Sequence, residues 1–129
     1  MTDVEQIRLD PDPYEPFRLS QGFRVGDLVI VSGQAAIDEN GEIVGLGDFD
    51  AQAEQVFRNL ARVLEAAGSG LDRVVKVTIY LTDMANFPKI VELRGTWFTA
   101  PYPADTIVEV SSLALPGLEI EIEAIAVTR

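Results

Sequence analysis

The chain has 129 residues, 47% of them hydrophobic, and it contains neither cysteine nor histidine. This length predicts one domain with a real core, and the missing residue types exclude disulfides, Ser-His-Asp or Cys-His catalysis, and zinc sites built on histidine or cysteine. The 10 basic and 21 acidic residues give a net charge of −11, which repels phosphate backbones, so we expect no nucleic-acid partner.

The sequence predicts neither a membrane span nor a signal peptide. No apolar stretch approaches the roughly 20 residues of a membrane span, and the first ten residues, MTDVEQIRLD, are too acidic and polar for a signal peptide. We therefore expect a cytoplasmic protein with no membrane partner. No EF-hand spacing is present, so any chemistry must come from carboxylates, hydroxyls, backbone dipoles, lysine, arginine or bound water.

The first third of the chain is expected to be mostly extended. Three prolines make residues 1–16 an irregular N-terminal segment of the single domain 1–129. The stretch FRVGDLVIVSGQ (residues 23–34) predicts two short strands about a Gly-Asp turn. The Asn-Gly pair within residues 38–44 predicts a hairpin.

Two helices and three strands are expected in the remainder. Residues 49–67 carry apolar side chains at helical spacing, with Asp48 or Asp50 at the start and a glycine at the end. Residues 74–83 alternate as a strand, and residues 84–99 predict a second helix. The segments TIVEV and EIEIEAIAV are the last two strands, so the order predicts an α+β fold with helices on one sheet face.

The last strand, residues 119–127, has two distinct faces. Its isoleucines at 120 and 122 and its alanines point one way, under the helices. The other face carries three glutamates followed by Ile125 and Val127. Such a face meets either solvent or a partner chain, and the two apolar residues favour an oligomer.

Four stretches together resemble the reactive-intermediate deaminase (Rid) family, whose members also carry the name endoribonuclease. They are LSQGFRVGDLVIVSGQ, DFDAQAEQVFRNLARVLEAAGSGLDRVVKVTIYLTDMANF, FTAPYPADTIVEV and LEIEIEAIAV, and they cover nearly all of the chain after about residue 17. The resemblance implies a chorismate-mutase-like fold: a six-stranded mixed sheet with two helices on one face, assembled as a homotrimeric barrel. It also implies a small-molecule cleft between subunits and the hydrolysis of enamines or imines without metal or organic cofactor.

Several positions match those that the family uses in its cleft. Glu121 falls on the glutamate that positions the attacking water. Ser32 and Gly33 fall on a cleft-lining Ser-Gly pair, and Phe87 falls on an aromatic residue near the cleft. The resemblance therefore implies that Glu121 is catalytic and that the other three contact the ligand.

Other positions depart from the family. Asp105 stands where deaminases carry an arginine that holds the substrate carboxylate, Leu19 replaces a tyrosine, and Val91 replaces an asparagine. Leu19 is still an expected ligand contact, as is Ile107, which shares the strand face of Asp105. An arginine offers a carboxylate two charge-assisted bonds of about 1.5–3 kcal/mol each, whereas a like charge at about 4 Å costs about 4 kcal/mol at an effective dielectric constant of about 20. The sequence therefore predicts weak binding of 2-iminobutanoate-type acids.

Two interpretations of Asp105 stay open. In one, Asp105 meets Glu121 of the same or a neighbouring chain, and the two carboxylates act as acid and base on a water molecule. In the other, Asp105 is a rim acid paired with Arg94 or Arg24 in an inactive cleft. The corresponding functions are a deaminase for another enamine or imine, with Glu121 and Asp105 catalytic, and a non-catalytic trimer that binds a small molecule or a partner protein. Ribonuclease activity ranks last, because of the charge and the missing histidine.

Overall fold

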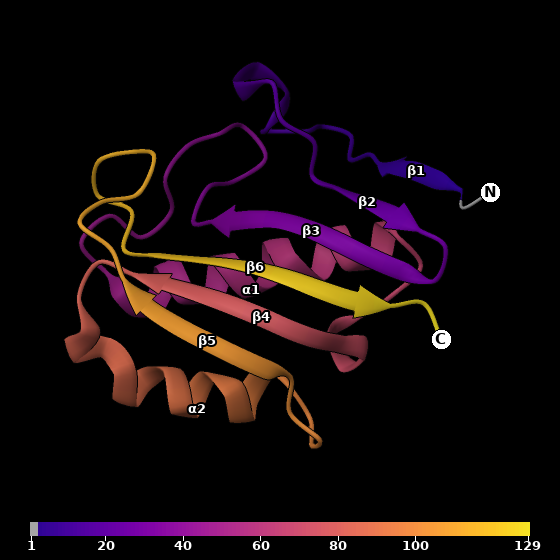
Figure 1. The fold of residues 1–129 in the computed structure, drawn as a ribbon. Helices are drawn as coiled ribbons and strands as arrows, with labels where there is room; N and C mark the ends of the chain where they lie inside the picture. Colours follow the sequence, from indigo (N-terminus) through magenta and orange to yellow (C-terminus); the bar gives the residue numbers. More distant parts are fainter. Residues whose placement is uncertain (1–2) are drawn as a thin grey trace.

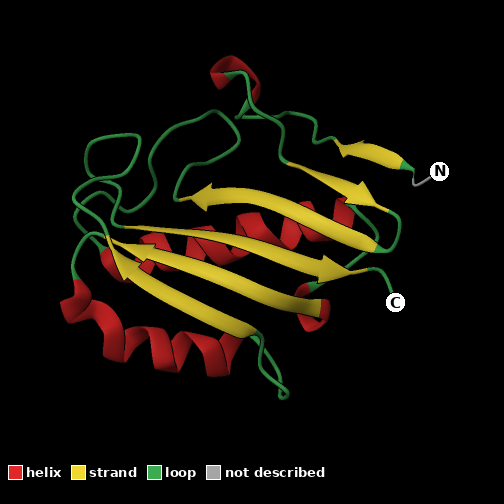
Figure 2. Ribbon diagram, in the orientation of Figure 1, coloured by secondary structure: helices red, strands yellow, loops and turns green. Residues whose placement is uncertain are grey.

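In the computed structural model, which describes residues 3–129, six strands form one mixed sheet and two α-helices cover one of its faces (Figure 1, Figure 2). The strands are β1 (Val4–Ile7), β2 (Gly22–Val25), β3 (Leu28–Ala35), β4 (Val74–Leu81), β5 (Ala104–Glu109) and β6 (Ile120–Val127). The helices are α1 (Phe49–Ala66) and α2 (Phe87–Trp97), with 3-10 turns η1 (Glu15–Phe17), η2 (Leu71–Arg73) and η3 (Met84–Asn86). The chorismate-mutase-like α+β architecture is confirmed.

The strand order in the sheet is β1-β2-β3-β6-β4-β5. The last strand, β6, therefore lies in the middle of the sheet, antiparallel to both β3 and β4. Among the strands of residues 3–129, only β4 and β5 are parallel, and α2 is the crossover that such a pair requires. This connection places α2 directly beside the edge strand β5 (Figure 1).

The core lies between the sheet and the helices. Alternate residues of each central strand are buried, as the period of two requires: Val29 and Val31 in β3, Val77, Ile79 and Leu81 in β4, and Ile120, Ile122, Ala124 and Ala126 in β6. Helix α1 buries Val56, Phe57, Leu60, Val63 and Leu64 against them. The start of α1 is capped by Asp48, whose side chain accepts a hydrogen bond from the Ala51 amide at 3.1 Å.

The N-terminal segment is more regular than the sequence predicts. Val4–Ile7 form the edge strand β1, with Val4 opposite Val25 and Ile7 opposite Gly22 of β2. All three prolines lie beyond this strand, so they do not interrupt its ladder, and the Ile7 side chain is buried. Residues 1–16 are thus not uniformly irregular, although the first two residues lie outside the part of the chain that is described.

The predicted hairpin at residues 38–44 is reduced to a turn. Gly41 has a φ of +80°, which suits glycine, and the Asp38 side chain accepts hydrogen bonds from the amides of Asn40 and Glu42. One isolated bridge, Ile37 to Ile43, takes the place of flanking strands.

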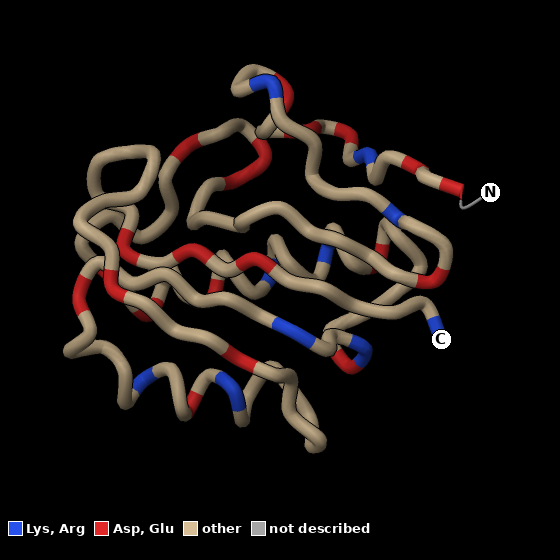
Figure 3. The backbone as a smooth tube through the Cα atoms, viewed as in Figure 1, with Lys and Arg blue, Asp and Glu red and all other residues tan. Residues whose placement is uncertain are grey.

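The face of the sheet opposite the helices is apolar in one part and acidic in another, as the β6 sequence predicts. Phe23, Ile30 and Ile125 are neighbours across β2, β3 and β6, and each is partly exposed. Acidic positions occupy the other half of β6 (Figure 3). The described part of the chain leaves this apolar row uncovered, which is typical of a surface that meets a partner.

Candidate functional site

Glu121 projects from the centre of the sheet on the face away from the helices. It is paired with Ala35 of β3 and Tyr80 of β4. Burial raises the pKa of its carboxyl group, and the charge of the neighbouring Glu123 raises it further. The Glu123 carboxylate instead accepts a hydrogen bond from the Tyr80 hydroxyl, an interaction that raises the pKa of Tyr80. The two acids are both partly buried, and Glu123 is the one that bonds Tyr80.

Gly33 makes room for the Glu121 carboxylate. The pairing of β3 with β6 is irregular between Val31 and Gln34, and Gly33 lies in this interval. A Cβ atom added at Gly33 would be 2.8 Å from Cδ of Glu121 and closer still to its Oε2. The carboxylate thus packs directly on the β3 backbone, so any side chain at position 33 would displace it.

Tyr14 holds this part of β3 in place, a role that the sequence did not reveal. Its buried hydroxyl donates to the Gly33 carbonyl at 2.5 Å and accepts from the Ala35 amide at 3.2 Å. Burial raises the pKa of Tyr14 to about 12, with smaller contributions from the charges of Glu121 and Asp12, while the Ala35 hydrogen bond acts in the opposite direction. Tyr14 therefore remains a neutral donor at the backbone that faces Glu121.

Asp105 forms an ion pair with Arg94, not with Arg24. Nε of Arg94 lies 2.9 Å from Oδ2 of Asp105, and Nη2 lies 3.0 Å from Oδ1. Only 25% of the Arg94 side chain and 17% of the Asp105 side chain are exposed. Two parallel bonds of this kind are the strongest geometry for such a pair. Arg24 binds Glu5 instead, at 2.6 Å.

A cavity of about 480 Å³ opens beside this ion pair, between α2 and the start of β5. Its lining consists of Val91, Arg94, Gly95, Phe98, Tyr102, Pro103 and Asp105. The Phe87 ring lies 5.8 Å from the guanidinium carbon of Arg94, within the range of a cation–π contact. Of the residues expected at a ligand, Asp105 thus lines this cavity, and Phe87 contacts its arginine.

Asp105 and Glu121 lie on opposite faces of the sheet within one chain. Asp105 is in register with the buried Val77 of β4 and so faces α2. Glu121 is in register with Tyr80, three residues further along β4 and therefore on the other face. The interpretation in which the two acids of one chain meet is wrong, and only a neighbouring chain can bring another Glu121 to this Asp105.

The remaining expected contacts are spread over the chain. Ser32 donates its hydroxyl to the Ser20 carbonyl at 2.6 Å, close to Gly33 in β3. Leu19 is exposed at a separate hollow beside β1, and Ile107 packs against the core. None of these three residues lines the cavity at Asp105.

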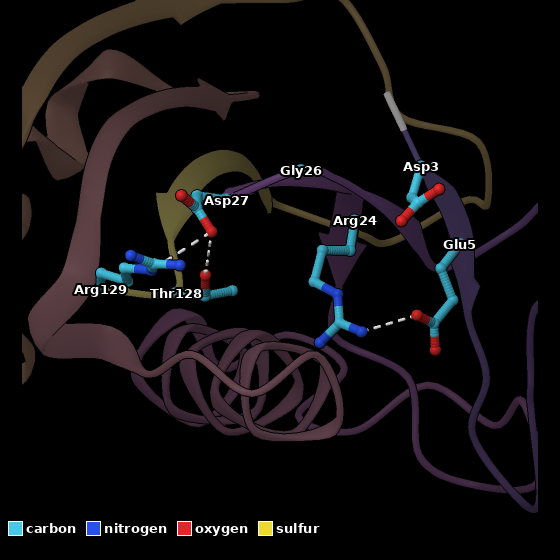
Figure 4. Close-up of a pocket in the computed structure, with 7 residues that line it drawn as sticks. All are labelled: Asp3, Glu5, Arg24, Gly26, Asp27, Thr128 and Arg129. Atoms are coloured by element: carbon cyan, nitrogen blue, oxygen red, sulfur yellow. Dashed lines mark hydrogen bonds and ion pairs between the residues drawn. The ribbon is translucent and has the colours of Figure 1, made fainter. Parts of the chain in front are cut away.

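A further hollow of about 460 Å³ lies where β1, the turn between β2 and β3, and the C-terminus meet (Figure 4). Four of its five charged side chains form two ion pairs, Arg24 with Glu5 and Arg129 with Asp27 at 3.5 Å, and the fifth is Asp3. Thr128 also donates its hydroxyl to Asp27 at 3.4 Å. Because these pairs neutralise most of its charge, the hollow offers little to attract an ionic ligand.

Residues 3–129 contain neither a cluster suited to a metal ion nor a membrane-spanning helix. No three acidic, cysteine or histidine side chains in this range gather into a possible metal site. No helix there is long and apolar enough to cross a membrane.

Known proteins resemble this chain over almost its whole length. The profile of the family described as Endoribonuclease L-PSP matches residues 10–128. A RutC family protein of Pyrococcus abyssi, PYRAB12510, is 45% identical over 117 residues, which are 90% of this chain and 89% of the relative. A 2-iminobutanoate/2-iminopropanoate deaminase of Dermatophagoides farinae is 34% identical over 119 residues, 92% and 91% of the two chains. The crystal structure of RidA from the Antarctic bacterium Psychrobacter sp. PAMC 21119 has a TM-score of 0.87 at 38% identity, covering 95% of this chain and 98% of that one.

Proposed function

Because this chain belongs to the Rid family, also known as the endoribonuclease L-PSP family, we propose that it hydrolyses an enamine or imine in a cleft between subunits, without a cofactor. The observation that carries this proposal is the Glu121 carboxylate, half-buried on the backbone of Gly33. A carboxylate with a raised pKa in such a place suits proton transfer to and from water. A relative named as an iminobutanoate and iminopropanoate deaminase supports the reaction class.

The reaction needs only a base, an acid and water. Glu121 accepts a proton from water as its oxygen bonds to the imine carbon, and the electron pair of the C=N bond moves to nitrogen. The protonated Glu121 then returns this proton to nitrogen, which gives a carbinolamine with one hydroxyl and one amino group on the same carbon. Glu121 next accepts the hydroxyl proton and delivers it to the amino nitrogen, the electron pair of the O–H bond forms the carbonyl, and the C–N bond breaks to release ammonia. Imine and water thus give a carbonyl compound and ammonia, with no net change in the protein.

The cleft requires a second chain, and a homotrimer is the assembly that we propose. The Asp105 cavity lies on the helix side at the edge strand β5, whereas Glu121 lies on the opposite face of its own sheet. A neighbouring subunit that lays its edge strand β5 along the open face of this sheet brings its own Asp105 cavity towards this Glu121. Burial of Phe23, Ile30 and Ile125 would stabilise that contact.

The substrate that we propose is not a simple anionic imino acid. Position 105 offers no cation, and its carboxylate repels an anion. We therefore expect poor activity on 2-iminobutanoate-type acids.

A second function, a trimer that binds a small molecule or a partner protein without turnover, is favoured by one observation. Asp105 is bound by Arg94 through both of its oxygens, an arrangement that joins α2 to β5 and needs no reaction to account for it. If this function holds, Glu121 has no reaction to serve.

The test is ammonia release from a panel of imines generated in situ, measured for the wild type, Glu121→Gln and Glu54→Gln. Glu54 is the control because it lies on the exposed surface of α1, away from the site. We expect Glu121→Gln to slow release by about 10²–10⁴-fold and Glu54→Gln to change it little. Equal rates in the wild type and Glu121→Gln would refute the enzymatic function. A trimer that binds ligands but releases no ammonia from any imine would support the second function.

A further inference from the structure

We propose that the Arg94–Asp105 pair is the recognition element of the cleft and that it selects a zwitterion: an α-amino or protonated α-imino acid with a bulky apolar side chain. This inference rests on the proposed function for the location of the cleft and names the class of ligand bound there. It assigns Arg94, on α2, the role of binding the ligand carboxylate.

The ion pair leaves one donor group and one acceptor group free. Arg94 uses Nε and Nη2 for Asp105, and its Nη1 donates to no atom of residues 3–129. Each Asp105 oxygen accepts one of these bonds and retains a further lone pair. Both residues line the cavity, so a donor and an acceptor lie side by side at its wall.

The balance of charge decides which ligands fit. The pair has no net charge, so a ligand with one charge meets attraction from one partner and repulsion from the other. A zwitterion is attracted by both, if its carboxylate lies at Nη1 and its ammonium or iminium nitrogen lies at Asp105. A carboxylate can therefore be recognised here although position 105 carries an acid, but only on a ligand that also carries a positive nitrogen.

The rest of the cavity specifies an apolar side chain. Val91, Phe98, Tyr102 and Pro103 form its walls. Its volume of about 480 Å³ falls within the range of about 300–1,000 Å³ typical of small-molecule sites. This space accommodates an aromatic or branched side chain.

The guanidinium is also held in position before a ligand arrives. The Phe87 ring contacts it at 5.8 Å, and Asp105 fixes two of its nitrogens. A preorganised group loses less conformational entropy on binding, which favours affinity.

Three probes that share a phenyl ring test the proposal by isothermal titration calorimetry on the intact protein. L-Phenylalanine carries both charges, 3-phenylpropanoate carries only the carboxylate, and phenethylamine carries only the ammonium group. We expect L-phenylalanine to bind at least about tenfold more tightly than either other probe. Equal or tighter binding of 3-phenylpropanoate or phenethylamine, or no binding of L-phenylalanine at about 10 mM, would overturn the proposal.

Three variants link the preference to this pair. Asp105→Asn should shift the preference towards 3-phenylpropanoate, and Arg94→Gln should shift it towards phenethylamine. Arg58→Gln is the control, because Arg58 pairs with Glu54 on the exposed surface of α1, and it should leave all three affinities unchanged. A preference for L-phenylalanine that persists in both Asp105→Asn and Arg94→Gln would contradict our assignment.

A double exchange covers the case in which a single variant fails to fold. Arg94→Asp combined with Asp105→Arg restores an ion pair and should retain the zwitterion preference, whereas loss of that preference in a folded double variant would count against the pair. These experiments measure binding and not turnover. Failure here therefore leaves the Glu121 proposal standing, and failure of the ammonia assay leaves this one standing.

Discussion

Arg94 and Asp105 join α2 to the edge strand β5 through two parallel hydrogen bonds of 2.9 and 3.0 Å. The strand position at which the family resemblance implies an arginine carries the acid, and the helix carries the arginine. The cation of this region is therefore present, but it comes from another element and is already paired. The cavity beside the pair thus keeps a guanidinium although position 105 carries an acid.

Replacement of Arg94 by methionine should lower the free energy of unfolding by about 1–3 kcal/mol, because it leaves the mostly buried Asp105 carboxylate without its partner. The control is Arg58→Met, whose ion pair has side chains 65% and 56% exposed and is worth no more than about 0.5 kcal/mol. Urea denaturation of both variants measures the difference. Equal effects would show that the pair between α2 and β5 does not stabilise the fold.

Gly33→Ala should displace the Glu121 carboxylate and reduce ammonia release by at least about tenfold. The φ of Gly33 lies outside the left-handed region, so the effect is steric and does not come from backbone strain. Gly95→Ala is a comparison for stability alone, because Gly95 lines the Asp105 cavity, a Cβ atom there meets nothing within 4 Å and alanine is favoured in a helix by about 1 kcal/mol. It should raise the melting temperature. Unchanged activity in Gly33→Ala would mean that the position of Glu121 does not matter for the reaction.

Tyr14→Phe should destabilise the protein by about 1–3 kcal/mol, because the Gly33 carbonyl and the Ala35 amide both lose their partner. Tyr80→Phe serves as the control, since its hydroxyl bonds a side chain, that of Glu123, and not two backbone groups, and it should cost less. Chemical denaturation compares the two variants. A larger loss in Tyr80→Phe would contradict the anchoring role of Tyr14.

The raised pKa of Tyr14 also predicts a loss of stability in alkaline solution. The folded protein keeps the Tyr14 proton up to about pH 12, whereas the unfolded chain releases it near the ordinary value of 10.0. The native state therefore binds more protons between these values, and stability falls as pH rises through that window. Tyr14→Phe lacks this contribution, so its unfolding free energy should decline less steeply there. Parallel slopes for both proteins would contradict a buried, neutral Tyr14.

Glu121→Gln should make the protein slightly more stable at pH 7, with a melting temperature higher by roughly 2 °C, a small value because the carboxyl group is only half-buried. Burial raises the pKa of Glu121 above 4.5, so the wild type loses stability as pH rises from 4.5 through the folded-state pKa. The advantage of the variant should therefore vanish below pH 4.5. Thermal melts at several pH values measure it, and a less stable Glu121→Gln at pH 7 would contradict the desolvation of Glu121.

The sequence by itself determined the features that depend on neighbours along the chain. The helical period of α1 and the two-faced alternation of β6 follow from local spacing, and the structure confirms both. The sequence also predicted that Asp48 or Asp50 caps α1, and the structure shows that Asp48 does so. Charge, length and the missing histidine likewise restrict function without reference to the fold.

Only the tertiary structure decided which distant groups meet. The Tyr14 hydroxyl bonds the backbone of Gly33 and Ala35, which lie 19 and 21 positions further along the chain. No periodicity in the sequence indicates this contact. The choice of Arg94 over Arg24 as the partner of Asp105, and the separation of Asp105 from Glu121, follow from strand register and from the crossover through α2. Register is set by pairing between segments far apart in the chain, so the face on which each acid lies is known only once the whole sheet has formed.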